Sequence, residues 1–186
     1  NISGWNTRYV TDMSSMFESA SEFNTDISDW DVSKVKDMSS MFKSATTFNQ
    51  ILDNWAVYNV KNMSSMFQNA YFFNENISGW NTRYVTDMSS MFKGAMAFNL
   101  DISNWDVSAV TNMSSMFEGS GFNKDIRNWT VSAVTDMSSM FKGAPAFNID
   151  ISSWNNKFDD VPTVVNMFLN SGMNFGNKFQ YPFKDI

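Results

Sequence analysis

The chain has 186 residues, with 13 basic and 19 acidic side chains and a net charge of −6. It contains no Cys and no His, which excludes disulfides, thiolate chemistry and every His-based triad or metal ligand. The acidic balance disfavours duplex nucleic acid and anionic membrane surfaces as partners, because both bind Lys and Arg. No apolar run approaches the roughly 18 residues that a membrane-spanning helix needs, so we expect no membrane insertion.

Trp residues recur along the whole chain at nearly constant spacing. They lie at positions 5, 30, 55, 80, 105, 129 and 154. A fixed period of this length is typical of arrays of stacked structural units. The segment "NISGWNTRYVTDMSSMF" occurs twice, at 1–17 and 76–92. The copies are three units apart, and copying whole units preserves every contact between neighbours.

The first predicted element of each unit is a short strand. In "DISDWDV", residues 26–32, an I-x-x-W-x-V pattern has the shape of the strand segment of leucine-rich repeats. Trp30 and Val32 alternate with period two and are expected to point inward. Asp29 and Asp31 are then expected to point outward.

A short helix is predicted next in each unit. Apolar side chains recur at i, i+3, i+6, i+7 and i+10, which fits one face of a helix. In the second unit these side chains are Val35, Met38, Met41, Phe42 and Ala45. Asp37, just before them, is a suitable N-cap. The segment is long enough to return the chain to a parallel strand in the next unit.

These elements together predict an α/β repeat solenoid of the leucine-rich-repeat type. Parallel short strands would line one face, and short helices or helical turns would line the other. Residues 1–175 would form about seven coils of 24–25 residues, the last one degenerate, and residues 176–186 a C-terminal cap. The chain begins inside a predicted strand, so the N-terminal coil is expected to be uncapped and either to follow upstream residues or to dock on another surface.

The repeat "FNTDISDWDVSKVKDMSSMFKSA" resembles those of BspA-like bacterial surface proteins and mycoplasma-type surface lipoproteins. These proteins form a divergent branch of the leucine-rich-repeat superfamily. The signature W-x-V-S-x-V-x-x-M-S-x-M-F recurs along the chain, and the resemblance extends from residue 1 to about residue 175. It implies an extracellular or cell-surface protein used for cell adhesion or protein binding. It implies no catalytic residues and no cofactor.

Three outward columns flank the Trp positions and are the candidate ligand surface. A solvated face without a ligand explains these columns about equally well. Arg and Tyr are residue types that carry interface energy, which favours a contact patch around Tyr58. The candidate partner-binding residues are Arg8, Asp29, Asp31, Asn54, Tyr58, Asn81, Arg83, Asn104 and Asp106.

Two polar columns are better explained by structure than by binding. The Asp column that contains Asp26, Asp101, Asp125 and Asp150 fits turn capping better than a metal site. The Asn column that follows each Phe fits inward stacking of Asn from coil to coil, where it would satisfy backbone groups.

The sequence therefore predicts a non-catalytic protein-binding or adhesion module at a cell or particle surface. A protein or glycan ligand would bind to the strand-lined face. The alternative is a structural subunit that is docked in a larger complex through its uncapped N-terminal coil. A polysaccharide-cleaving enzyme with paired carboxylates is a third hypothesis, but Asp in the same role in several coils argues for structure.

Overall fold

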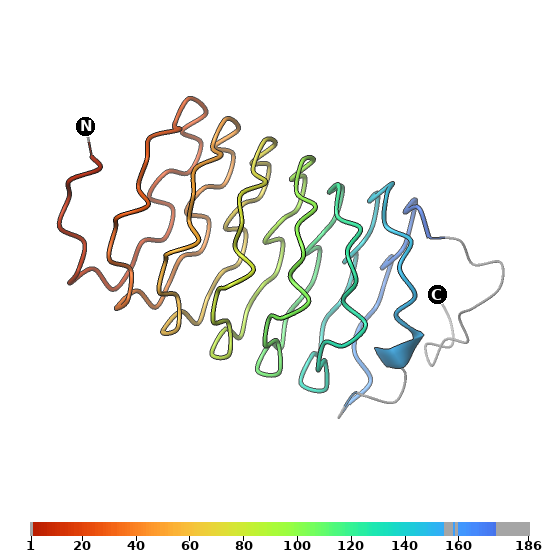
Figure 1. Ribbon diagram of the computed structural model, residues 1–186. Coiled ribbons are helices and arrows are strands. Elements are labelled where there is room, and N and C mark those ends of the chain that lie inside the picture. The colour runs from red at the N-terminus through yellow and green to blue at the C-terminus, as the bar shows by residue number, and fades with distance from the viewer. Residues whose placement is uncertain (1, 155–157, 159, 174–186) are drawn as a thin grey trace.

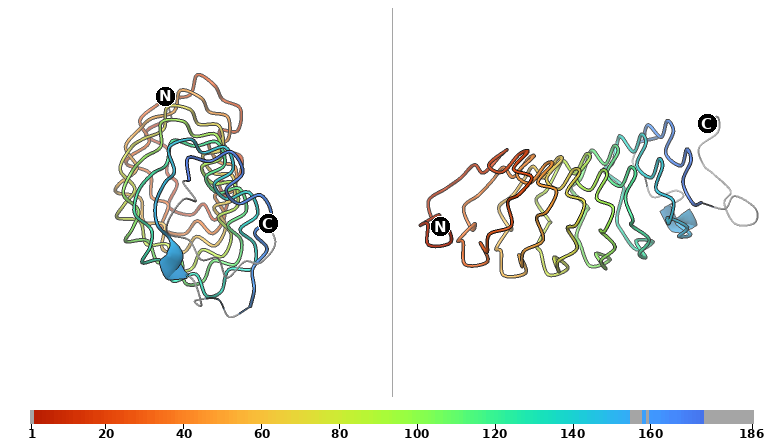
Figure 2. Two further views of the ribbon diagram at one scale, coloured as in Figure 1. Left: turned by 90° about the vertical axis from the view of Figure 1, so that its right-hand side faces the viewer. Right: turned by 90° about the horizontal axis from the view of Figure 1, so that it is seen from above.

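The chain forms an elongated stack of similar coils, seen from the side in Figure 1 and from two further directions in Figure 2. The computed structural model describes residues 2–154, 158 and 160–173. We number the coils by their Trp residues, so that the first coil carries Trp5 and the second carries Trp30. Asp12 forms a parallel β-bridge with Asp37 of the next coil, and Asp37 forms one with Asn62. Residues at the same repeat position therefore form columns along the stack.

The predicted α/β solenoid of parallel strands and helices is wrong. The only helix among the described residues is the three-residue 3-10 helix η1 (Ser152–Trp154). Their β structure consists of isolated parallel bridges between successive coils and includes no extended strand. Residues 26–32, predicted as a strand, are irregular and contain a turn at 28–29. The predicted C-terminal cap, residues 176–186, lies outside the described residues.

The segment predicted as a helix is a series of tight turns. The N–H of Met41 donates to the carbonyl of Met38, three residues earlier, at 3.2 Å. Ser40 and Ser44 have φ angles of 57° and 58°. These angles lie in the left-handed region, which a right-handed helix excludes. Three-residue turns bring apolar side chains to one side at almost the same spacing as a helix, so the pattern alone could not separate the two structures.

Alternate N–H groups of this segment donate to the next coil. Met38 donates to the Asn62 carbonyl at 3.0 Å, and Ser40 donates to the Ser64 carbonyl at 2.8 Å. The parallel bridges lie at the start of the same segment. The part of each coil that was predicted to be helical is therefore the most strand-like part of the molecule, and it holds the stack together.

The interior is a continuous core of Trp, Val, Met and Phe side chains. The Phe42 ring stacks on Phe48 of its own coil at 3.9 Å between centroids and on Phe67 of the next coil at 5.5 Å. The Trp55 and Trp80 rings are 6.5 Å apart, with an angle of 4° between their planes. The predicted inward orientation of Trp30 and Val32 is confirmed, because both side chains are buried.

Hydrogen bonds from the indole groups also join the coils. The Nε1 of Trp80 donates to the Leu52 carbonyl of the preceding coil at 2.9 Å, and that of Trp105 donates to the Ile77 carbonyl at 3.1 Å. Trp in this column is therefore both a large apolar group and a polar link to the neighbouring coil.

The polar columns form turns and ladders. The Oδ1 of Asp26 accepts the N–H of Ser28 at 3.0 Å, which confirms turn capping. The Oδ1 of Asn24 accepts the N–H of Asn49 at 2.9 Å, so stacking of the Asn column is confirmed. The inward orientation predicted for this column is wrong, because Asn24 is exposed and Asn49 is half-buried. Asp37 accepts the N–H of Ser39 at 2.8 Å and so caps a turn rather than a helix.

Candidate binding surfaces

The described residues include no cluster of three or more acidic side chains placed to hold a metal ion. None of the helices in that part of the chain is long and apolar enough to span a membrane. Two surfaces stand out instead. One is the edge of the stack on which the predicted binding residues lie, and the other is the outer face of the first coil.

All nine predicted binding residues are exposed, but they do not lie on a sheet face. The described residues around each Trp form no strand, so the prediction of a strand-lined binding face is wrong. Asp29, Asn54 and Asn104 lie in the turn before each Trp. The other six residues follow a Trp and lie in the second turn of their coils or just before it. They are Arg8, Asp31, Tyr58, Asn81, Arg83 and Asp106.

The local geometry around Arg8 is repeated around Arg83. The guanidinium carbon of Arg8 lies 5.1 Å from the centre of the Tyr9 ring, and that of Arg83 lies 5.0 Å from the Tyr84 ring. Both distances are within the range of a cation–π contact. Asp31 of the next coil lies close enough to Arg8 for an electrostatic interaction between the two charges.

Two of the three carboxyl groups among these nine residues, those of Asp31 and Asp106, have a lowered pKa. Hydrogen bonds from Ser33, with a smaller contribution from the Arg8 and Lys34 charges, lower the pKa of Asp31. Hydrogen bonds from Ser108, with a smaller contribution from Arg83, lower the pKa of Asp106. The surface therefore presents fixed charges of both signs near neutral pH.

Five basic side chains gather on this edge in the first four coils, at repeat positions three, four and six after Trp. We call this set the cationic edge, and it consists of Arg8, Lys34, Lys36, Lys61 and Arg83. Three exposed tyrosines accompany it, namely Tyr9, Tyr58 and Tyr84. Sequence reasoning missed the three lysines, Tyr9 and Tyr84, because these residues follow the predicted strand of each unit and were not counted on its face. The signal that could have found them is their shared register in the repeat.

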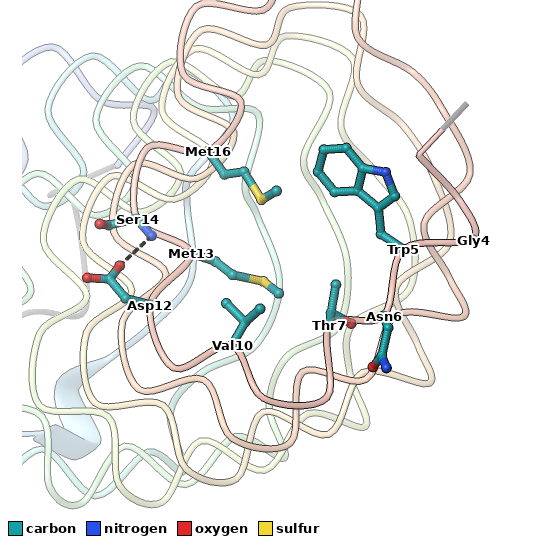
Figure 3. A pocket seen from close by; sticks show the side chains of 9 residues that line it. All are labelled: Gly4, Trp5, Asn6, Thr7, Val10, Asp12, Met13, Ser14 and Met16. Atoms are coloured by element: carbon teal, nitrogen blue, oxygen red, sulfur yellow. Dashed lines mark hydrogen bonds between the residues drawn. The ribbon is translucent and has the colours of Figure 1, made fainter.

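The first coil is open on its outer side. A cavity of about 600 Å³ lies there, and Figure 3 shows the Trp5, Val10, Met13 and Met16 side chains pointing into the space that the coil surrounds. Trp5 is 54% exposed and Met16 is 38% exposed. The side chains at the same positions of the interior coils are buried.

The outer face also carries a row of carbonyl groups. Carbonyls at these repeat positions of the second coil accept hydrogen bonds from the first coil at 2.7 to 2.9 Å. In the first coil they accept none from any other described residue. These groups are the carbonyl oxygens of Asp12, Ser14, Met16 and Glu18.

The fold defines a protein built from stacked repeat units, with the two exposed surfaces described above. The chain belongs to the family described as "Mycoplasma protein of unknown function, DUF285", which matches residues 1–85 and 72–180. Comparison with curated proteins and with solved structures gives no match. The predicted membership of a mycoplasma-type repeat family is therefore confirmed.

Proposed function

We propose that this protein is a non-catalytic protein-binding or adhesion module at a cell or particle surface. The observation that carries the proposal is the cationic edge with its tyrosines. Arg and Tyr are enriched among residues that dominate interface energies. The stack presents them in successive coils, so one partner can contact several of them at once.

The repeat itself supports a surface location. Its resemblance to the repeats of BspA-like surface proteins is the reason for proposing an extracellular or cell-surface protein. A link to the leucine-rich-repeat superfamily belongs to the same proposal and rests on the same resemblance. A protein ligand is favoured over a glycan, because Arg and Tyr are typical of protein interfaces.

An adhesion assay would test this function. Beads coated with the protein would be applied to arrays of immobilised surface proteins and glycans, with Arg8→Ala/Tyr58→Ala/Arg83→Ala as the test variant. The matched control is Ser108→Ala/Ser132→Ala, which changes the same column in the fifth and sixth coils. We expect retention by the wild type and the control, and loss by the test variant. Failure of the wild type to adhere to any member of the arrays would reject the function.

A second candidate function is that of a structural subunit docked through the first coil. The exposed Trp5 and Met16 and the four carbonyl groups favour it, since a further coil of the same kind would bury the apolar groups and donate to the carbonyls. Trp5→Lys/Met16→Lys should abolish association measured by analytical ultracentrifugation, while Tyr71→Lys/Met96→Lys, at exposed side chains of the interior coils, should not. A wild-type chain that remains monomeric at every concentration and with every candidate partner would reject this function.

A further inference from the structure

The second copy of the seventeen-residue segment shows what fits the outer face of the first copy. Residues 76–92 are identical to residues 1–17, so the two copies offer the same backbone and side-chain groups. On the side that faces the start of the stack, residues 76–92 contact the third coil, residues 51–75 (Figure 1). On the same side of the first copy the described residues place no coil. The third coil is therefore a template for the occupant of this outer face.

The third coil bonds to the fourth through a regular hydrogen-bond pattern. Its N–H groups at Met63, Ser65 and Phe67 donate to three carbonyls of the fourth coil at 2.8 to 3.0 Å. The accepting carbonyls belong to Asp87, Ser89 and Met91. One bond runs in the opposite direction, from the N–H of Thr86 to the Lys61 carbonyl at 2.8 Å. This face of the fourth coil therefore presents one donor followed by a row of acceptors.

The first coil presents the same groups without partners among the described residues. Three of its carbonyls accept no hydrogen bond from them, and these carbonyls belong to Asp12, Ser14 and Met16. The N–H of Thr11, which is equivalent to Thr86, donates none to them. The indole N–H of Trp80 donates to the third coil at 2.9 Å, whereas that of Trp5 has no acceptor among the same residues. The first coil therefore lacks the partner that its copy has.

This pattern selects a coil of the repeat type over a regular strand. Each edge of a regular strand presents N–H and C=O groups in turn, so some of its carbonyls would face the carbonyl row of the first coil. Carbonyls that are buried without donors cost free energy. In the third coil, left-handed φ angles of 58° at Ser65 and 57° at Asn69 accompany alternate N–H groups that all point to the same side. A segment with the backbone of the repeat therefore avoids that cost.

We propose that the outer face of the first coil binds a segment with the hydrogen-bonding pattern of residues 51–75, supplied by another protein chain that carries this repeat. This inference rests on the second candidate function, docking through the first coil, and names its partner class. The segment adds to the stack as a further coil. Its N–H groups bond to the carbonyl row, and its Trp ring stacks on Trp5 as Trp55 stacks on Trp80 at 6.5 Å. Its apolar side chains fill the cavity of the first coil (Figure 3).

Fluorescence anisotropy with labelled synthetic peptides and the 186-residue chain tests this inference. The probe has the sequence of residues 51–75. The test peptide is the same sequence with N-methyl groups at Ser65 and Phe67, which removes two donors to the carbonyl row. The matched control has them at Asn54 and Tyr58, whose N–H groups donate no hydrogen bond to a described residue.

The expected order of affinities follows from the number of donors. Each backbone hydrogen bond contributes up to about tenfold in affinity, so the test peptide should bind at least about tenfold more weakly than the probe. The control peptide should bind nearly as tightly as the probe. Equal affinity of all three peptides would overturn the hydrogen-bond pattern, and absence of binding by the probe would overturn the partner class.

Variants of the chain locate the site. Trp5→Lys/Met16→Lys should abolish binding of the probe, because it places charge in the space that the added coil fills. Tyr71→Lys/Met96→Lys makes the same change of charge at exposed side chains of interior coils and should leave the affinity unchanged. Equal losses in the two variants would overturn the site.

Hydrogen exchange in the wild-type chain checks the site without a substitution. Binding of the probe should slow exchange at the Thr11 N–H, which gains an acceptor. Exchange at the Thr86 N–H, which already has one, should not change. Binding of the probe without protection of Thr11 would place the peptide elsewhere and would also overturn the site.

Three further outcomes separate this inference from the docking function. A peptide of the same length with alternating Val and Thr that binds as tightly as the probe would show that any strand fits, and would overturn the selection of the repeat. Association in ultracentrifugation that Trp5→Lys/Met16→Lys abolishes, without binding of the probe, would reject this partner class and leave docking through the first coil standing. Absence of association and of probe binding together would reject both.

Discussion

The same seventeen residues occur at 1–17 and at 76–92, and the two copies differ in their surroundings. Trp5 is 54% exposed, whereas Trp80 is 3% exposed. Met16 is 38% exposed, whereas the equivalent Met91 is fully buried. The copy in the fourth coil has a coil on each side, and the copy in the first coil has one on one side only. Burial of the repeat is thus a property of neighbours.

The local structure of the two copies is nevertheless the same. The φ angle is 56° at Ser15 and 55° at Ser90. The hydroxyl of Thr7 donates to the Asp31 carbonyl at 3.1 Å, and that of Thr82 donates to the Asp106 carbonyl at 2.9 Å. Turns and side-chain hydrogen bonds therefore need at most one neighbour, whereas the closed core needs two. This matches the view of repeat proteins as units with nearest-neighbour coupling.

Replacing Trp by Ala in each copy is expected to give the largest difference in stability between the fourth coil and the first. Trp80→Ala should lower the free energy of unfolding by about 3–5 kcal/mol, because it leaves a cavity in a packed column. Trp5→Ala removes a side chain that is more than half exposed, so its cost should be below about 1 kcal/mol. Urea unfolding followed by circular dichroism measures both. Equal costs would show that the first coil is as well packed as the fourth.

A second test concerns how closely coils approach. A Cβ at Gly121 would meet the Met96 carbonyl oxygen of the preceding coil. Gly121→Ala should therefore cost about 1–3 kcal/mol, as overpacking does. Gly79→Ala, in the copied segment, is the matched control, because no atom lies within 4 Å of its Cβ position. Thermal unfolding compares the two variants, and a neutral Gly121→Ala would argue against this close contact.

The third test asks whether the turns are local. Ser15→Gly and Ser90→Gly each remove the strain of a left-handed residue, which is about 1–2 kcal/mol, and add the backbone entropy of Gly, which is about 0.5–1 kcal/mol. We expect a gain of up to about 1 kcal/mol at Ser90 and a smaller one at Ser15, whose hydroxyl also donates to the Glu18 carboxylate at 2.7 Å. A loss of stability in Ser90→Gly, measured by urea unfolding, would show that the left-handed angle does not strain the turn.

The smallest expected effect is on how the stability of the fold changes at acidic pH. Burial raises the pKa of Glu118, but hydrogen bonds from Lys93 and Ser115 outweigh it, so the pKa lies below the ordinary value of 4.5. A lowered pKa stabilises the fold above pH 4.5, and this stability is lost as the pH falls through the folded-state pKa.

Glu118→Gln should therefore reduce stability at neutral pH and flatten its decline in acid. Glu18 forms a comparable ion pair with Lys43 at 2.8 Å, but on the first coil, where both side chains are about one third exposed. Glu18→Gln should have a smaller effect in the same series of thermal unfolding curves. A pH dependence identical to that of the wild type in Glu118→Gln would contradict this role.

Several residues of the candidate binding surface could be predicted from the sequence. Arg8, Tyr58 and Arg83 were predicted from their outward register, and all are exposed. Lys34 and Lys36 were missed, because they follow the predicted strand, residues 26–32, and fall at the start of the predicted helix. In the structure Lys34 lies in the second turn of its coil and Lys36 lies just after it, and both are exposed.

The sequence by itself determined the period, the columns and the apolar spine, because a repeat of 24 or 25 residues brings chemically equal side chains together in each coil. Asx turns and the Asn ladder also followed from residue type, since short polar side chains bond to nearby backbone groups. Only the tertiary structure decided that alternate N–H groups of the Met-Ser-Ser-Met segment donate to carbonyl groups of the next coil. A backbone N–H has alternative acceptors of similar strength, and the packing of neighbouring coils selects between them.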